Sequence, residues 1–132
     1  MRKRFMIAWS DWTRTEERVA EDLSGIQAFI ESLSLSPDPP MLLSIWEEGT
    51  TRELGVGLGR AQTVLTYQES ADPPYYISLG RPDADGEEWF CYGQEWTEYL
   101  ARNLVPNDVI APTEKMFVTE PSRPTTVAWE KL

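Results

Sequence analysis

A run of alternating glycines in the middle of the chain constrains the fold more than any other feature. Residues 52–67 have the sequence R-E-L-G-V-G-L-G-R-A-Q-T-V-L-T-Y, in which Leu54, Val56 and Leu58 alternate with glycine. A period of two is typical of a β-strand with one buried face. A second alternating run follows a short link at Gly59, so the whole segment is predicted to form a β-hairpin.

Further alternating or apolar runs predict strands on either side of this hairpin. These strands are predicted at Phe5–Trp9, Met41–Trp46, Tyr75–Leu79, Glu87–Tyr92 and Thr125–Trp129. The runs nearest to the hairpin can extend it into a β-meander. Residues 13–22 are highly charged and compatible with either a strand or a helix, while residues 94–105 are predicted to be irregular.

One helix is predicted after the charged segment. Ser24 is placed to cap its N-terminus, and Gln27 completes a capping box. The helix must end before Pro37, because the proline-rich stretch 36–40 offers few backbone donors and fixes φ repeatedly. Its apolar face is predicted to pack on the sheet, since four residues recur at helical spacing: Ile26, Phe29, Ile30 and Leu33.

A second helix is predicted to carry Met116 and Phe117. Asn107 or Thr113 is expected to cap it, and Pro112 is tolerable only in its first turn. Prolines that follow the helix end it before the last strand.

The order of these elements indicates the fold class. With 132 residues the chain can bury about 65–70% of its unfolded surface as one domain. Strands, a helix, a meander and a second helix predict an α+β domain over residues 1–132, in which a mostly antiparallel β-meander sheet packs with two helices.

The charge of the chain restricts its direct partners. The sequence has 22 acidic and 12 basic residues, a formal net charge of −10. Nucleic acid is excluded as a direct partner, because neutralising phosphates needs clustered lysine and arginine. An acidic surface suits a basic protein, although net acidity can also serve only to keep a chain soluble.

Most catalytic and cofactor sites are excluded by composition. The chain has no histidine, which removes Ser-His and Cys-His nucleophiles and most zinc sites. Cys91 lies in an apolar, aromatic strand and is predicted to be structural. The glycine run 55–59 lacks the lysine of a phosphate loop, and Asp83–Gly86 is only half of a calcium loop. We therefore expect no catalytic residue, no metal and no cofactor.

The location of the protein is predicted from what its sequence lacks. A single cysteine fits a reducing compartment. The apolar run near the start is shorter than the roughly 7–15 residues of a signal peptide, and none reaches the ~20 residues of a membrane span. A cytoplasmic location without membrane association is expected.

Adjacent carboxylates raise an alternative, enzymatic hypothesis. Glu47 and Glu48 form one pair, and Glu87 and Glu88 form another. Neighbours on a strand point to opposite faces, so solvent-exposed charge is the favoured interpretation. The alternative is a small-molecule-binding module or carboxylate-dependent hydrolase on the sheet face, which would need a deep pocket with two converging carboxylates.

Tryptophan and tyrosine beside carboxylates indicate a protein-binding surface. The chain has six tryptophans and five tyrosines, and at least half of these rings are expected to fill the core, Trp129 among them. Aromatic rings bordered by charge are typical anchors of protein interfaces. The candidate partner-binding residues are Trp46, Glu48, Tyr75, Glu87, Glu88, Trp89, Glu95 and Trp96.

Several segments resemble one protein family. They are the strand-turn-strand segment 53–67, the stretch from Val105-Pro106 through the helix around Met116 and Phe117, and the closing R-P-T-T-V-A-W-E at residues 123–130. Together they are similar to the first-numbered immunity-protein family of bacterial polymorphic toxin systems. Residues 23–33 match the early helix of that family.

The resemblance implies a function by binding. Members of that family are thought to neutralise toxin domains, often nucleic-acid deaminases, by direct contact. The resemblance therefore implies that the chain is not an enzyme and that its partner is a basic cognate toxin domain. A monomer or weak dimer is expected. An acidic protein can occupy the basic cleft of such a toxin.

Overall fold

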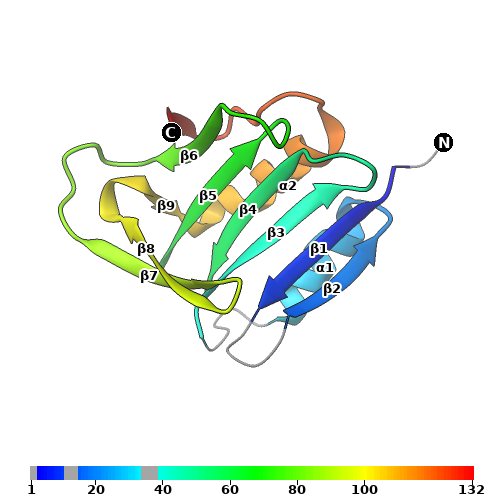
Figure 1. Cartoon of the computed structure of the whole chain (residues 1–132), viewed down its shortest axis with the longest axis horizontal. Helices are drawn as coiled ribbons and strands as arrows, with labels where there is room; N and C mark the ends of the chain where they lie inside the picture. The colour runs from blue at the N-terminus through cyan, green and yellow to red at the C-terminus, as the bar shows by residue number, and fades with distance from the viewer. Residues whose placement is uncertain (1–2, 11–14, 34–38) are drawn as a thin grey trace.

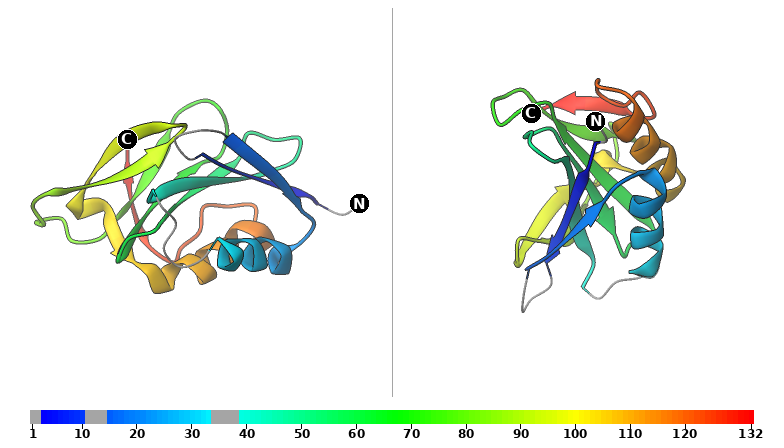
Figure 2. Two further views of the ribbon diagram at one scale, coloured as in Figure 1. Left: turned by 90° about the horizontal axis from the view of Figure 1, so that it is seen from below. Right: turned by 90° about the vertical axis from the view of Figure 1, so that its right-hand side faces the viewer.

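A curved, largely antiparallel sheet packs one of its faces against α1 and α2 (Figures 1 and 2). The computed structural model describes residues 3–10, 15–33 and 39–132, and in this part of the chain ten strands join one sheet and two α-helices are present. The predicted α+β class and largely antiparallel sheet are confirmed. Pro37, within the predicted proline-rich stretch, lies outside the described residues.

The elements follow one another in a fixed order. Short 3₁₀ turns at Ala101–Asn103 and Asn107–Val109 lead into β9 and α2. The strands and helices are β1 Phe5–Ser10, β2 Thr15–Ala20, α1 Leu23–Ser32, β3 Met41–Glu47, β4 Glu53–Leu58, β5 Gln62–Gln68, β6 Tyr75–Leu79, β7 Glu87–Tyr92, β8 Glu95–Leu100, β9 Leu104–Pro106, α2 Ile110–Thr119 and β10 Ala128–Lys131.

The sheet is built around the predicted meander. Its main path runs β10-β6-β5-β4-β3-β1-β2, so β3, β4, β5 and β6 are consecutive neighbours. Part of the charged segment left open by the sequence, Thr15–Ala20, forms β2, which pairs with β1 over its whole length, while residues 13 and 14 lie outside the described residues. β7 and β8 leave this path as a hairpin, joined to β3 by a parallel pairing of Cys91 with Met41. The short β9 pairs with the start of β5.

The prediction that residues 94–105 are irregular is wrong. β8 pairs with β7 from Glu87 and Leu100 to Tyr92 and Glu95. Its sequence, E-W-T-E-Y-L, has little apolar alternation, because much of the hairpin is exposed. Pairing with β7, which the local sequence does not encode, makes it a strand.

The predicted helix starts also need correction. Asp22, not Ser24, caps α1, and its carboxylate accepts a hydrogen bond from the Gly25 amide at 2.8 Å. α2 follows Val109 without a side-chain cap. Asn107 instead donates its side-chain amide hydrogen to the Arg60 carbonyl oxygen at 2.9 Å. Asn107 begins the 3₁₀ turn that leads directly into α2, so it is not the cap of that helix.

Other predicted boundaries are close to the observed ones. Pro112 lies in the first turn of α2, as predicted, and α1 ends before Pro37. Thr113 is buried in α2, where its hydroxyl bonds that of Thr126. The last strand is Ala128–Lys131 rather than 125–129, since only this stretch pairs with β6.

Both faces of β4 are buried, so the predicted single buried face is also wrong. Leu54 and Val56 belong to the core between the sheet and the helices. On the other side Gly57 faces Phe90 of β7, and a Cβ atom at Gly57 would lie 2.9 Å from a Phe90 ring carbon. The glycines let the hairpin approach the sheet closely, and a second core forms there around Phe90.

Arg52 joins the sheet to the end of α2. It is 9% exposed, and its Nε donates to the Tyr67 hydroxyl at 3.1 Å. Its Nη1 donates to the Phe117 carbonyl oxygen at 2.8 Å, and its guanidinium carbon lies 4.2 Å from the centroid of that ring. Its Nη2 donates to the Glu120 and Ser122 carbonyl oxygens at 2.8 and 3.1 Å.

The partners of Arg52 are groups that a helix end needs to satisfy. The last carbonyls of a helix lack intrahelical donors and carry the negative end of its dipole. The guanidinium supplies both donors and positive charge at the C-terminus of α2. It thereby fixes the helix against the start of β4.

Replacing Arg52 by lysine should show how much these contacts stabilise the fold. Lysine keeps the charge but loses the planar fork that reaches several acceptors at once. We expect R52K to lower the free energy of unfolding by roughly 2–4 kcal/mol in chemical denaturation. The exposed Arg81→Lys control should change it by less than about 0.5 kcal/mol. Equal stability of the two variants would contradict the role of Arg52.

Adding a methyl group at Gly57 should disturb the hairpin-side core. We expect G57A to destabilise the protein by roughly 1–3 kcal/mol, because the new Cβ overlaps the Phe90 ring. Adding F90L should relieve part of this overlap, so the double variant should lose less stability than the two single losses combined. A double-mutant cycle in urea measures the coupling, and strictly additive losses would argue against it.

Candidate functional site

The β7–β8 hairpin carries side chains of different character on its two sides. Phe90 is fully buried against the sheet, and its ring meets Tyr99 edge to face with centroids 5.8 Å apart. On the other side Trp89 and Trp96 stack with centroids 6.4 Å apart and an interplanar angle of 19°. Trp96 is 44% exposed. The hairpin lies on the side of the sheet opposite α1 and α2 (Figure 2).

Strand pairing surrounds the indole stack with acids and a leucine. Trp89 is paired in register with Glu98, and Glu87 with Leu100, which is 43% exposed. Alternate residues of a strand share a face, so these side chains lie on the same side as the stack. We name this surface the outer hairpin face, and it consists of Glu87, Trp89, Trp96, Glu98 and Leu100.

Arg60, in the turn between β4 and β5, fixes the hairpin to the main sheet. Its Nε donates to the Trp89 carbonyl oxygen at 2.8 Å and lies 3.3 Å from a carboxylate oxygen of Glu88. Its guanidinium carbon lies 5.9 Å from the centroid of the Trp96 ring. These contacts set the orientation of the indole stack relative to the sheet.

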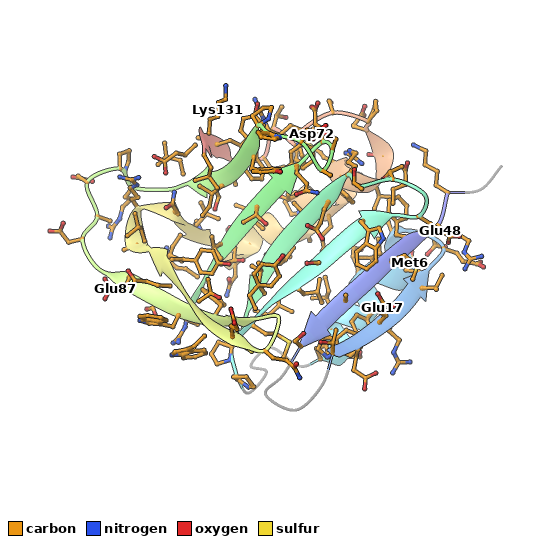
Figure 3. The ribbon with its side chains drawn as sticks, viewed as in Figure 1. Met6, Glu17, Glu48, Asp72, Glu87 and Lys131 are labelled. Atoms are coloured by element: carbon orange, nitrogen blue, oxygen red, sulfur yellow. The ribbon has the colours of Figure 1, made fainter. Side chains whose placement is uncertain are left out.

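The predicted contact residues fall into separate places. Trp46 and Tyr75 lie on what we name the open face, the side of the sheet away from the helices and beside the hairpin, where Met6, Glu17, Thr66 and Gln68 also lie. Glu48 lies in the β3–β4 turn, far from Glu87 (Figure 3). The rest lie on the hairpin, with Glu87, Trp89 and Trp96 on its outer face and Glu88 and Glu95 on its other side.

The predicted acidic contacts differ in how the chain neutralises them. Glu48 forms an ion pair with Arg4 at 3.0 Å, and Glu88 pairs with Arg60. Within the described ranges, Glu87 and Glu95 form no ion pair. The negative charge of these two exposed residues is therefore available to a partner.

Glu98 and Leu100 were not singled out in the sequence, although they complete the outer hairpin face. The prediction of an irregular segment 94–105 hid them. The available signal was their spacing, since Trp96, Glu98 and Leu100 are two residues apart and share one side of a strand.

A cleft of about 170 Å³ lies between the open face and the inner side of the hairpin. Tyr75, Tyr92 and Tyr99 line it together with Glu53. Burial raises the pKa of Tyr99 to about 12, with a smaller contribution from Tyr92. Burial also raises the pKa of Glu53, while a hydrogen bond with Ser44 partly opposes that rise. Among its described lining residues this cleft has one side-chain carboxylate, not the pair that a hydrolase would need.

The adjacent carboxylates do not converge either. Glu47 lies 3.4 Å from the Lys3 ammonium nitrogen, whereas Glu48 pairs with Arg4. Glu87 is exposed on the outer hairpin face, and Glu88 turns to Arg60. Each acid thus has its own surroundings, as expected for neighbours on a strand.

A second cleft, of about 280 Å³, opens between α1, α2 and the end of β4. We name it the helix-side cleft, and Glu114 of α2 lines it. Glu114 is 2% exposed, and its Oε2 atom has no hydrogen-bond partner. Burial raises the pKa of Glu114 to about 8, so the carboxyl is mostly protonated at neutral pH. Sequence analysis did not single it out, because its burial depends on α1 and β4.

In the described residues no group of three or more Cys, Asp and Glu side chains is placed to hold a metal ion. No helix in the same ranges combines the length and apolar character needed to cross a membrane.

Comparison with known protein families identifies the family of this chain. A family model described as immunity protein Imm1 matches residues 14–131, which is nearly the whole chain. The chain belongs to the Imm1 family. A search of curated proteins gives no significant match.

Membership of the Imm1 family confirms the resemblance drawn from the sequence. The matched range includes the meander, both helices and the whole of the last strand. For this Imm1 protein, membership implies neutralisation of a cognate toxin, and hence a toxin as its partner. The surfaces described above are therefore candidates for the place where that toxin binds.

The buried carboxyl of Glu114 should make the stability of this Imm1 protein depend on pH. Its pKa is about 8 when folded and near 4.5 when unfolded, so between these values the unfolded chain binds fewer protons. The free energy of unfolding should therefore fall as pH rises through this range, by at most about 1.4 kcal/mol per pH unit. Denaturation at several pH values measures the slope.

The variant E114Q should have a flatter pH profile than the unmodified chain and should be more stable at pH 8. Exposed Glu120→Gln on the same segment is the charge-matched control and should keep the original slope. A slope unchanged in E114Q would mean that Glu114 is not the titrating group.

Proposed function

We propose that this Imm1-family chain neutralises a nucleic-acid deaminase toxin by covering its basic active-site cleft with the outer hairpin face. The observation that carries the proposal is the stack of the half-buried Trp89 on the exposed Trp96, held on an acid-bordered hairpin. The deaminase class is supported by the resemblance to a family often paired with such toxins. We further propose that the encounter takes place in the cytoplasm, where nucleic acid is the substrate.

The indole stack has the properties of an interface anchor. Tryptophan is enriched among residues that dominate binding energy, because a large ring buries much area while losing little conformational freedom. Trp96 and Leu100 are both more than two-fifths exposed in the absence of a partner. Contact with a toxin would bury them, and the Arg60 contacts already hold the ring in place.

Charge supports the same surface. Glu87 and Glu98 of the outer hairpin face form no ion pair in the described part of the chain, and the whole sequence carries a net charge of −10. A toxin that acts on nucleic acid presents a basic cleft, so opposite charges would steer the two proteins together. Association can then reach about 10⁸–10⁹ M⁻¹s⁻¹ at low salt, and an interface of about 1,600 Å² in total would be ordinary.

Three of the predicted contact residues lie away from the hairpin. Tyr75 uses its hydroxyl to bond the Ala71 carbonyl oxygen, and Trp46 is half buried on the open face. Glu48 is already paired with Arg4. We propose that these three residues contact the toxin at the edge of the interface, if the toxin extends beyond the hairpin.

Truncating the indole stack should release the toxin. We expect W96A to weaken binding to the toxin domain encoded beside this chain by at least about 30-fold, mainly through faster dissociation. W89A should have a similar effect. The matched control is Y92A, an exposed ring on the opposite side of the same hairpin, and surface plasmon resonance provides both rate constants.

The charge of the same surface is tested separately. The pair E87Q and E98Q, both on the outer hairpin face, should slow association and reduce its dependence on salt, while the controls Glu17→Gln and Asp72→Asn, at other edges of the molecule (Figure 3), should not. A loss with Y92A but not with W96A would move the contact to the tyrosine-lined cleft. A bound toxin that cleaves nucleic acid without deaminating it would overturn the deaminase class.

A further inference from the structure

The helix-side cleft has a lining that favours one kind of occupant. Its polar side chains are the carboxyls of Glu31 and Glu114 and the amides of Gln27 and Asn107, and its described lining contains no lysine or arginine. Its walls are otherwise mostly apolar, with Ile30 from α1 and residues of α2 and β4. The cleft is thus rich in hydrogen-bond acceptors and poor in positive charge.

One carboxyl oxygen of Glu114 lacks a hydrogen-bond partner in this cleft. Its side chain is almost fully removed from water, and Oε2 makes no hydrogen bond. A buried polar atom without a partner is costly and uncommon in native proteins. Glu31, at the exposed rim, is the other titratable side chain among the described residues that line the cleft.

The chemistry of the occupant follows from these groups. An anion would meet two carboxyls in a strongly acidic protein and is disfavoured. A neutral donor could bond Glu114 but would leave its carboxyl protonated. A cation with N–H donors can bond and also stabilise the ionised carboxylate, which makes it the best match.

The size and walls of the cleft restrict the cation further. A volume of about 280 Å³ is at the lower end for ligand pockets, which suits a small organic molecule or a single side chain. Apolar contacts from Ile30 and Ile110 suit an aliphatic stem rather than a hydrated metal ion. Long cationic side chains combine an apolar stem with a charged end in this way.

We propose that the helix-side cleft binds an alkylguanidinium or alkylammonium group, whose N–H donors pair with the Glu114 carboxylate while its stem packs against Ile30 and Ile110. The group can come from a free small amine or from an arginine or lysine side chain of a bound protein. The site is separate from the outer hairpin face and does not depend on the proposed function.

Titration with n-butylguanidinium, followed by amide chemical shifts in NMR spectra, tests this site directly. We expect saturable shifts at Gly57 and Gly59, and binding at least about tenfold tighter than that of n-butylurea, a neutral molecule of the same shape. Binding should strengthen between pH 6 and 8, by at most about tenfold per pH unit, because the guanidinium stays charged while Glu114 must lose its proton.

Two variants test whether the probe binds in the helix-side cleft. E114Q preserves the shape of the side chain and should weaken binding at least about tenfold while removing its pH dependence. A111L should block the cleft from α2 without changing Glu114, and it remains informative should E114Q fail to fold. Glu120→Gln, outside the cleft on the same segment, should bind the probe as the unmodified chain does.

The same variants distinguish the two sources of the cation. If E114Q and A111L also weaken toxin binding, a toxin arginine or lysine occupies the cleft. If they weaken the probe alone, the occupant is a free small cation. Failure of the chain to bind any toxin would reject the proposed function but leave the probe titration unaffected. Absence of saturable shifts, or equal binding by E114Q, would overturn the site.

Discussion

The buried guanidinium of Arg52 is the contact on which the arrangement of sheet and helices depends. A cation withdrawn from water needs acceptors around it, and Arg52 finds the Tyr67 hydroxyl and three main-chain carbonyls at the end of α2. No carboxylate of the described residues forms an ion pair with it. The Arg52 guanidinium and the carbonyl oxygens at the end of α2 therefore satisfy each other's hydrogen bonds. These bonds hold α2 over the core between the sheet and the helices.

The opposite side of the sheet depends on the absence of side chains. Because Gly57 has no side chain, the Phe90 ring can lie directly against β4. The β7–β8 hairpin therefore folds over the sheet. Burying Phe90 on the inner side leaves Trp89 and Trp96 on the outer side, because neighbouring residues of a strand alternate. The exposed indole stack, and with it the proposed toxin contact, is thus a consequence of close packing at a glycine.

Negative charge is distributed unevenly between paired and unpaired acids. Glu48 and Glu88 are neutralised by Arg4 and Arg60, so they hold the fold together more than they attract a partner. Glu87 remains exposed beside the indole stack. Glu114 is buried instead, and there the cost of ionisation raises its pKa to about 8. Acidic residues therefore differ in role with their surroundings: the paired ones contribute to structure, Glu87 belongs to the proposed toxin contact and Glu114 to the proposed ligand site.

The sequence by itself determined the meander, both helices, the α+β class and the family, because periodicity and turn residues are local properties. It also singled out Trp89 and Trp96 with their acidic neighbours. Only the tertiary structure decided that β8 is a strand, that Leu100 joins the outer hairpin face and that Glu114 is buried. The four acceptors of Arg52 lie 15 to 70 residues along the chain from it. Contacts at such separations arise from the packing of sheet and helices, and no local pattern encodes them.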